Sequence, residues 1–484
     1  MDKIKRFLFK NSNTKQTIAK NTFWIGGSTI VMKVLRAGII IYVARILGTE
    51  GYGVFTYAMS IAAIFAVFSD MGLSSILTRE LSTDSVDRKT YLSTSIVVKL
   101  GFLFITFVGI ALIGPHVSRF SSSASLLPII GLSLIFESAR GFLYAITRSQ
   151  NRMQIEAGLG IITELVCTLL VVIVFFKNPT PHSLALAYMI GNGLGFFAVV
   201  IALRKYLSGI FQYVKKSLII PIIKASLPFT IMGVFGILMT NIDSVIIGVY
   251  NNESVLGLYG AAQRPVSILY IIPGFLEASI FPILARYVSE KKEGRTATLV
   301  EKSILIALGI ALPITAGGAI IARPFINAAF GYEYVGAALT LQILLFSLIF
   351  SFPSSMISQV VLAEKRQRAL VLASILGAST NVVLDLILIP KYGISGSAIA
   401  TLFAQIVASG VYFASISKYN PLVIGLKAWK LVIATLVMTA ATYTLKSFSI
   451  PLFIIIPFAG AIYIAVLLLL RERLITDIRT SLRS

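Results

Sequence analysis

The chain has 484 residues, of which 57% are hydrophobic and only 13% are charged. Soluble domains are about 45–50% apolar and about 25% charged, so this composition excludes a water-soluble globular protein. A formal net charge of +22 would suggest nucleic-acid binding, but the basic residues lie between long apolar runs and not on a soluble basic domain. We therefore expect no nucleic-acid partner. The single cysteine, Cys167, excludes an internal disulfide framework and a multi-cysteine metal site.

The apolar runs are long enough to cross a membrane. A helix that spans the hydrocarbon needs about 20 mostly apolar residues. The connections between the runs are short, so no soluble domain is inserted. The sequence therefore predicts an all-α polytopic membrane protein with about fourteen transmembrane helices. The predicted spans are residues 21–44, 53–77, 92–114, 125–147, 155–176, 183–203, 225–249, 256–284, 303–322, 337–362, 370–389, 395–416, 431–446 and 451–470.

The distribution of Lys and Arg predicts the orientation, because basic residues favour cytoplasmic loops. If the N-terminus is cytoplasmic, most of the 42 Lys and Arg residues fall in cytoplasmic segments. We therefore expect a multi-pass protein of the cytoplasmic (inner) membrane with both termini in the cytoplasm. The basic residues predicted to be external are Arg45, Arg119, Lys177, Arg323, Lys391 and Lys446.

The two halves of the chain resemble each other weakly. Gly53 matches Gly257 at a spacing of 204 residues, and Arg152 matches Arg366 at a spacing of 214. Further matches at these two spacings are Lys20 with Lys224, Ala58 with Ala262, residues 133–136 with 347–350, Lys177 with Lys391 and Ser183 with Ser397. The matches pair helices 1–6 with helices 7–12. Because six is even, these halves would be parallel repeats around a central cavity, as in several transporter folds.

The duplication predicts the domain organisation. Both lobes start on the same side of the membrane, and helices 13 and 14 follow them as an addition. The predicted parts are a basic cytoplasmic N-terminus at 1–20, an N-lobe at 21–203, a cytoplasmic linker at 204–224, a C-lobe at 225–416, helices 13 and 14 at 417–470 and a basic cytoplasmic tail at 471–484.

Several predicted spans contain a basic residue: Lys33, Arg36, Lys99, Arg140 and Arg264. Such a residue at bilayer depth costs at least about 2.5–3.5 kcal/mol, so it normally faces a cavity and marks function. Lys33 and Arg36 are three residues apart and share a helix face. A cluster of cations suits an anionic substrate, because Arg holds phosphate oxygens bidentately and Lys acts as a point charge. We predict a substrate cavity lined by these residues.

The alternative is that some of these cations form structural ion pairs with Glu137, Glu156 or Glu164. Arg140 lies three residues after Glu137, so both interpretations stay open for it. Lys33 and Arg36 have no acidic residue near them in sequence, which favours the cavity.

The second half carries oxygen ligands instead: Asp243, Asn381, Asp385, Ser397 and Thr401. Asn381 and Asp385 are four residues apart on one helix face, as are Ser397 and Thr401. Oxygen ligands from three helices suit a hard monovalent cation or a proton. We predict a coupling-ion site here, with the cation held by Asp243, Asn381, Asp385 and Thr401. The alternative for Asp385 is a helix-end carboxylate at the external surface.

Other patterns indicate no catalytic site or cofactor. Gly191, Gly193 and Gly195 form a G-x-G-x-G pattern inside an apolar helix, which favours close helix packing over phosphate binding. The sequence contains no Ser-His-Asp set and no P-loop, so hydrolysis of a nucleotide by this chain is not expected.

Four segments resemble those of polysaccharide-repeat flippases of the O-antigen type. This family belongs to the multidrug/oligosaccharidyl-lipid/polysaccharide exporter superfamily and is related to the lipid II flippase. The resemblance extends over nearly the whole chain. The segments are LGTEGYGVF at 47–55, SDMGL at 69–73 followed by Arg79-Glu80, LGLYGAAQR at 256–264 and AFGYEY at 329–334.

The resemblance implies a substrate, an oligosaccharide on an undecaprenyl or dolichyl pyrophosphate carrier. It also implies a sodium site formed by Asp243, the pair Asn381 and Asp385, and groups of helix 12, where a main-chain carbonyl is the family ligand at Ser397. The lipid II flippase has arginines on helices 1, 2 and 8. Lys33, Arg36 and Arg264 match two of these helices, but helix 2 lacks a buried basic residue. This difference argues against lipid II as the substrate.

These observations predict a flippase that works by alternating access and is coupled to a Na⁺ or H⁺ gradient. A polysaccharide polymerase and chain-length proteins are candidate partners. One alternative is a multidrug/cation antiporter of the same superfamily, which would need an acidic cavity. Another is a membrane polysaccharide polymerase or ligase, an enzyme that would need a substantial external loop.

Overall fold

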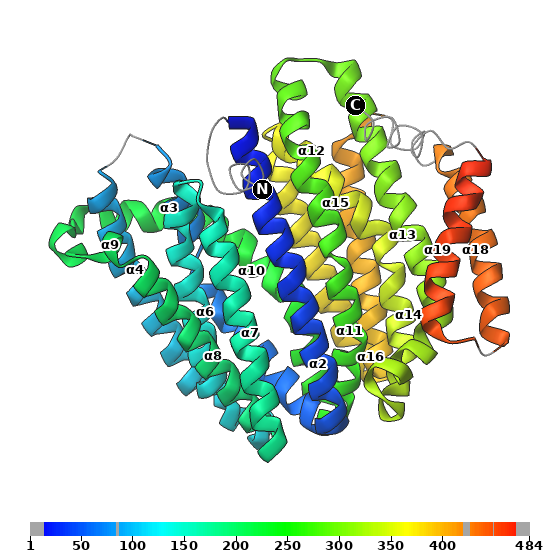
Figure 1. The fold of residues 1–484 in the computed structure, drawn as a ribbon, viewed down its shortest axis with the longest axis horizontal. Coiled ribbons are helices and arrows are strands. Elements are labelled where there is room, and N and C mark those ends of the chain that lie inside the picture. The colour runs from blue at the N-terminus through cyan, green and yellow to red at the C-terminus, as the bar shows by residue number, and fades with distance from the viewer. Residues whose placement is uncertain (1–13, 84–86, 420–425, 449, 471–484) are drawn as a thin grey trace, which may run out of the picture. The chain divides into compact units, whose positions relative to one another are not determined.

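The computed structural model describes residues 14–83, 87–419, 426–448 and 450–470, and Figure 1 shows their arrangement in helices. No β-strand occurs in these ranges, which confirms the predicted all-α fold. The chain divides into two compact units, Met1–Gly257 and Leu258–Ser484. This division differs from the predicted boundary between the lobes, because the helix predicted to begin the C-lobe packs against α2 and α3 in the first unit. The functional lobe boundaries therefore stay a prediction.

The first unit contains the first seven predicted spans. Its first long helix, α2, holds two of them and breaks at Gly48, whose φ of 66° and ψ of −178° are not helical. The helices are α2 (Thr14–Ala66), α3 (Leu73–Leu81), α4 (Arg88–Val108), α5 (Gly114–Val117), α6 (Ser121–Ser149), α7 (Met153–Lys177), α8 (Pro181–Ala202), α9 (Arg204–Leu207) and α10 (Ile219–Tyr250), with short 3₁₀ or π turns between some of them.

The second unit contains the remaining spans. The long helix α16 again holds two of them, and it breaks at Gly393, whose φ is 57°. The next predicted pair, helices 13 and 14, corresponds to α18 and α19. The helices are α11 (Glu253–Leu269, which starts in the first unit), α12 (Ile271–Ser289), α13 (Glu293–Phe330), α14 (Ala338–Phe346), α15 (Leu348–Ala363), α16 (Gln367–Ser415), α18 (Trp429–Ser447) and α19 (Leu452–Leu469), with the 3₁₀ turn η5 (Tyr332–Ala337) before α14.

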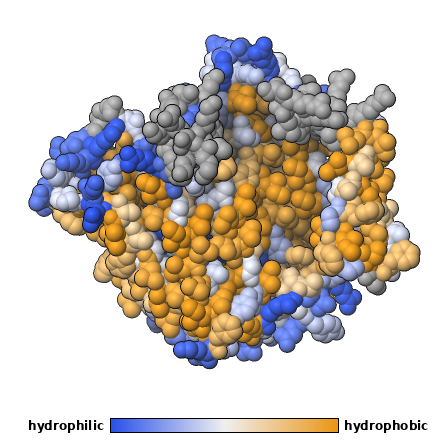
Figure 2. Space-filling view, viewed as in Figure 1, coloured by the Kyte–Doolittle hydropathy of each residue, from blue (hydrophilic) through white to orange (hydrophobic). Residues whose placement is uncertain are grey.

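The helices have the length and hydropathy of membrane spans. In the described part of the chain, ten helical segments pass both tests. One of these segments is α16, which contains two predicted spans. The two arms of α2 and the helix α18 bring the total to about fourteen. Figure 2 shows apolar side chains over the middle of the helices and hydrophilic side chains at their ends. These findings confirm a multi-pass membrane protein.

The added helices α18 and α19 pack beside α13. Leu431 and Met438 of α18 share an apolar cluster with Tyr463 and Leu467 of α19 and with residues of α13. The hydroxyl of Tyr463 donates a hydrogen bond of 2.8 Å to the carbonyl of Gly309 on α13. The α18–α19 hairpin, orange and red in Figure 1, is therefore held by both apolar packing and a polar contact.

The backbone repeats itself at two equivalent turns. Asn151 joins α6 to α7 with a φ of 56°, and Lys365, at the predicted spacing of 214, joins α15 to α16 with a φ of 58°. The amides of the arginines that follow, Arg152 and Arg366, each donate a 2.9 Å hydrogen bond to a carbonyl in the last turn of the preceding helix. Non-glycine residues rarely adopt positive φ, so this coincidence strengthens the case for duplication.

Gly53 and Gly257, which the predicted duplication pairs, lie where their two segments of backbone meet. A Cβ atom on Gly53 would overlap the carbonyl of Glu253, and a Cβ on Gly257 would overlap the carbonyl of Thr49. The starts of the second arm of α2 and of α11 therefore meet backbone to backbone. Only glycine permits an approach this close.

We expect Gly53→Ala to destabilise the protein by about 1–3 kcal/mol, because the added methyl group overpacks a contact between two backbones. The thermal unfolding midpoint of the purified protein in detergent measures this change. Gly38→Ala is the matched control, since nothing lies within 4 Å of a Cβ at Gly38 on the same helix. Equal midpoints for the two variants would contradict the importance of this contact.

Candidate substrate and ion sites

Arg36 lies on α2 and forms an ion pair that its sequence neighbours do not reveal. Its Nε and Nη2 donate to the two carboxylate oxygens of Glu164 on α7, at 3.2 and 3.1 Å. Glu137 on α6 lies 4.0 Å from the same guanidinium. The Arg36 side chain stays 45% exposed, whereas Glu164 is 8% exposed. This pairing is the structural alternative considered above, and it couples three helices of the first unit.

Lys33 and Arg140 lie on α2 and α6 of the same unit. Within the described residues, no hydrogen bond or ion pair engages the ammonium of half-buried Lys33. Arg140 donates from Nη1 to Oδ1 of Asn192 on α8 at 3.3 Å, and the amide of Asn192 donates to Ser133 Oγ at 3.0 Å. Arg140 therefore pairs with an amide and not with Glu137 in its own helix.

Lys99 on α4 is buried in a polar cluster. Its Nζ lies 2.7 Å from Asp70 and donates a 2.9 Å hydrogen bond to Ser138 Oγ. The Lys99 side chain is only 3% exposed. Asp70 also accepts from the hydroxyl and the amide of Ser74, so it fixes the first turn of α3. In this conformation Lys99 connects α4 to the α2–α3 turn and is enclosed by the unit.

The turn that presents Asp70 explains part of the SDMGL segment. Met71 and Gly72 both have positive φ, at 44° and 74°. The hydroxyl of Thr230 on α10 donates to the carbonyl of Met71 at 2.8 Å. A Cβ on Gly72 would overlap the side chain of Phe229. The glycine therefore lets the turn approach α10 and directs Asp70 towards Lys99.

The oxygen ligands predicted for a cation lie on different units. Asp243 is 1% exposed on α10 of the first unit. Asn381, Asp385 and Ser397 on α16 are 1%, 0% and 0% exposed, and Thr401 of the same helix is half-buried. Because Asp385 is fully buried, it is not an exposed helix-end carboxylate.

The α16 group contains buried polar atoms that lack hydrogen-bond partners. Among the residues that the structure describes, neither the amide nitrogen nor the amide oxygen of Asn381 has a hydrogen-bond partner, and the same holds for Ser397 Oγ. Burying such atoms without partners costs about 1–3 kcal/mol each. Unsatisfied oxygens beside a buried carboxylate fit a small cation better than a packing role. Among the described residues, no group of three or more His, Cys, Asp or Glu side chains could hold a metal ion.

The first unit carries different residues at the positions that the predicted duplication pairs with these polar side chains. At the 214-residue spacing, Cys167 and Val171 of α7 occupy the positions of Asn381 and Asp385. Both are buried, at 3% and 0% exposure. Ser183, the counterpart of Ser397, hydrogen-bonds to its own helix start at Thr180 and Asn178. The first unit therefore fills these positions with apolar or satisfied groups.

The basic residues are asymmetric in the same way. At the 204-residue spacing, Ile237 and Thr240 of α10 stand where α2 has Lys33 and Arg36. Each half-chain thus carries one set of ionisable groups that its counterpart lacks. Arg264, on α11 of the second unit, is half-buried and is the exception among the predicted cations because it lies outside the first unit.

The G-x-G-x-G pattern packs helices together, as the sequence predicts. A Cβ on Gly191 would lie 2.5 Å from the Cys167 sulfur on α7, and one on Gly195 would overlap Thr163 of the same helix. A Cβ on Gly195 would also lie 2.8 Å from the Arg140 guanidinium. The missing side chains therefore allow α7 and α8 to meet and leave room for Arg140.

Fold and site together define a polytopic membrane protein with buried ionisable groups, the class to which secondary transporters belong. The chain matches the family described as "Polysaccharide biosynthesis protein" over residues 18–288, more than half of its length, and it belongs to this family. Residues 236–387 also match the MatE family.

Three similar proteins are described as flippases or transporters. The chain is 22% identical over 370 residues to the probable low-salt glycan biosynthesis flippase Agl15 of Haloferax volcanii, with 75% of each chain covered. Its fold matches the inward closed lipid II flippase MurJ with a TM-score of 0.73 at 19% identity, over 93% of this chain and 98% of that one. An inward-facing multidrug resistance MATE transporter matches with a TM-score of 0.64 at 15% identity, over 83% and 95%.

We expect Asp70→Asn to destabilise the protein by about 2–3 kcal/mol, because it leaves the buried ammonium of Lys99 without its charged partner. Chemical denaturation in detergent measures the loss. The double variant Lys99→Met with Asp70→Asn should recover part of it. Glu290→Gln, which breaks the exposed Arg286–Glu290 pair, is the control and should cost less than about 1 kcal/mol.

Proposed function

We propose that this protein is a flippase that moves a polyprenyl-pyrophosphate-linked oligosaccharide across the cytoplasmic membrane by alternating access. Membership of the polysaccharide biosynthesis family supports a role in glycan export. The observation that carries the proposal is a set of ionisable side chains in the predicted spans of one half of the chain. At the positions that the predicted duplication pairs with them, the other half has neutral residues. A scaffold that only packed its helices would not need that difference.

Lys33 and Arg36 are the proposed first contacts of the pyrophosphate. The ammonium of Lys33 is not engaged by any described side chain, so it can donate to a phosphate oxygen without breaking an existing pair. Arg36 is held by Glu164 in this conformation, and its guanidinium is half exposed. A pyrophosphate competes for the same donors, because guanidinium binds carboxylate and phosphate with one geometry. Substrate arrival thus exchanges an internal ion pair for an intermolecular one.

That exchange provides a physical link between binding and helix movement. The Arg36–Glu164 pair joins α2 to α7, and Glu137 adds α6. Releasing the pair leaves two carboxylates near each other and removes the ion pair between α2 and α7. Lys99 and Arg140 hold neighbouring helices through Asp70 and Asn192 and complete the basic region.

The proposed driving force is the entry of Na⁺ or H⁺, bound at Asn381 and Asp385 of α16. The unpartnered atoms of Asn381 and Ser397 support this assignment. One positive charge that moves inward through the membrane potential is worth about 2.3 kcal/mol per 100 mV. This energy is enough to bias a cycle between two states that differ by a few kcal/mol. Thr401 of the same helix, α16, is proposed as a further contributor.

The alternative of a multidrug/cation antiporter has one observation in its favour, the match of residues 236–387 to the MatE family. Such a transporter needs an acidic binding region for cationic drugs. The group formed by Lys33, Arg36, Arg140, Glu137 and Glu164 has more cations than acids. Expression in a drug-sensitive strain separates the two functions, since an antiporter raises drug resistance and the proposed flippase does not.

We expect Lys33→Gln with Arg36→Gln to lower flipping of a polyprenyl-pyrophosphate oligosaccharide at least tenfold, because each lost charge-assisted hydrogen bond is worth about 1.5–3 kcal/mol. The assay measures the fraction of lipid-linked oligosaccharide that becomes accessible on the far side of proteoliposomes. Lys177→Gln, an exposed cation outside the group, is the control. Unchanged flipping in the double variant would overturn the phosphate assignment.

We expect flipping to depend on a Na⁺ or H⁺ gradient, and Asp385→Asn to remove that dependence. A second variant, Asn381→Cys with Asp385→Val, transfers the residues that the duplicated half packs at Cys167 and Val171. It should remain folded, with a thermal midpoint close to that of the parent, and it should lose ion coupling. Gradient dependence that persists in both variants would rule out this ion site.

A further inference from the structure

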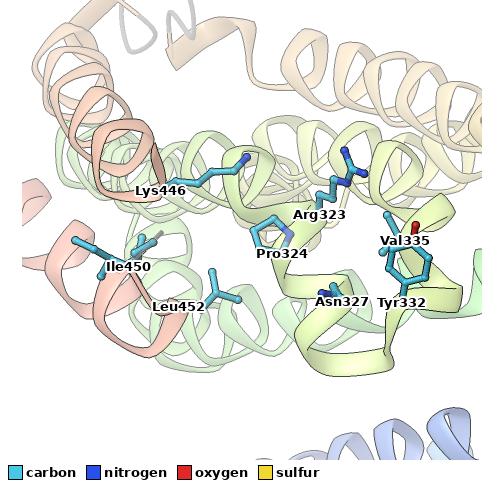
Figure 3. Close-up of a pocket in the computed structure, with 9 residues that line it drawn as sticks. Arg323, Pro324, Asn327, Tyr332, Val335, Lys446, Ile450 and Leu452 are labelled. Atoms are coloured by element: carbon cyan, nitrogen blue, oxygen red, sulfur yellow. The ribbon is translucent and has the colours of Figure 1, made fainter. Parts of the chain in front are cut away.

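A pocket of about 470 Å³ lies at one end of α13, outside the sites described above. It is bordered by the end of α13, the turn η5 and the α18–α19 hairpin, all in the second unit. Its polar lining is formed by Arg323, Asn327, Tyr332 and Lys446, which Figure 3 shows around one space. Helix α13 ends at Phe330, so the pocket lies where a membrane helix ends.

Pro324 explains why Lys446 is held at this pocket. A proline inside a helix has no amide hydrogen, so the carbonyl four residues earlier loses its helical donor. That carbonyl belongs to Ile320, and Lys446 Nζ donates to it at 2.7 Å from the end of α18. One of the three ammonium hydrogens is thereby used to fix the side chain. The other two are available to a ligand.

Arg323 precedes this proline and supplies the second cation. Its side chain is exposed, and no acidic side chain of the described ranges lies within ion-pair distance of it. Glu333 of η5 is the acid nearest in sequence, and it too is exposed without an ion pair in those ranges. Figure 3 shows Lys446 reaching from α18 towards α13, where Arg323 lies. Two cations beside an amide and a phenol suit an anionic ligand.

The pocket continues into an apolar groove. Ile455 of α19 lines both, and Ala322 of the groove precedes Arg323 of the pocket. The groove has a volume of about 670 Å³ and runs between α13 and α19 over side chains such as Ile314, Ile456 and Ile464. A cationic end joined to a long apolar groove matches a molecule with an anionic head and a hydrocarbon tail.

We propose that this pocket and groove bind an anionic phospholipid of the surrounding leaflet, with the phosphate at Arg323 and Lys446 and one acyl chain along the groove. Basic pockets between membrane helices bind anionic head groups in this way. The site lies at helix ends, the depth at which phosphates occur in a bilayer. Arg323 and Lys446 are both predicted to be external, which assigns the lipid to the outer leaflet.

A bulk phospholipid fits this site better than a rare lipid carrier. The cations are few and exposed, so the affinity for one phosphate is modest, and the occupant is set by abundance. Bound there, the lipid would join α13 to the α18–α19 hairpin through both its head and its chain. This proposal does not depend on the proposed flippase function, because it concerns different residues and a different ligand.

The test is binding of dioleoyl phosphatidylglycerol and dioleoyl phosphatidylcholine to the purified full chain in detergent, measured by native mass spectrometry. We expect phosphatidylglycerol to bind about tenfold tighter. Arg323→Gln, alone and together with Lys446→Gln, should reduce that preference to nearly equal binding. Lys391→Gln, an exposed cation also predicted to be external, should leave it unchanged. The single variant keeps the hydrogen bond from Lys446 to α13, so its result does not depend on that link.

Three results would overturn the proposal. The first is an unchanged preference for phosphatidylglycerol in both variants. The second is displacement of phosphatidylglycerol by an equal concentration of undecaprenyl phosphate, which would assign the site to the carrier lipid. The third is equal competition by glycerol phosphate alone, which would show that the groove takes no part in binding.

Discussion

The structure depends on how a bundle of membrane helices accommodates charged side chains. Lys99 is buried against Asp70, and Arg36 is held by Glu164 from a helix far away in sequence. Each pair offsets a desolvation cost and fixes which helices are neighbours. Where such pairs exist, ionisable residues organise the bundle. Where polar atoms stay unsatisfied, as at Asn381, the fold carries a cost that a ligand can remove.

The duplication makes this distinction visible within a single chain. Equivalent turns at Asn151 and Lys365 share the same unusual backbone, so the two halves use one scaffold. The side chains then differ where the ionisable groups lie. Cys167 and Val171 show that the Asn381 and Asp385 positions can be filled by apolar packing. The two halves of the chain differ at these positions for a reason other than folding. We propose that the reason is binding.

The second unit adds a feature with a different physical basis. Pro324 removes a helical hydrogen bond, and the replacement donor, Lys446, comes from α18. One missing amide hydrogen thus joins the added hairpin to α13 and places a cation at the helix end. Beside it runs an apolar groove between α13 and α19. Helix α13 and the α18–α19 hairpin therefore meet both requirements of a lipid. They supply charge for its head group and apolar surface for its acyl chain.

The sequence by itself determined the helices, because the length and hydropathy of a span are local properties. It also predicted the packing role of Gly191 and Gly195, since glycine leaves space whatever its neighbour is. It could not determine that Arg36 meets Glu164, because 128 positions separate them and only helix packing brings them together. The tertiary structure likewise decided that Lys99 is enclosed and that Asp385 is fully buried. Pairing between distant charges depends on the geometry of the bundle, which no local pattern encodes.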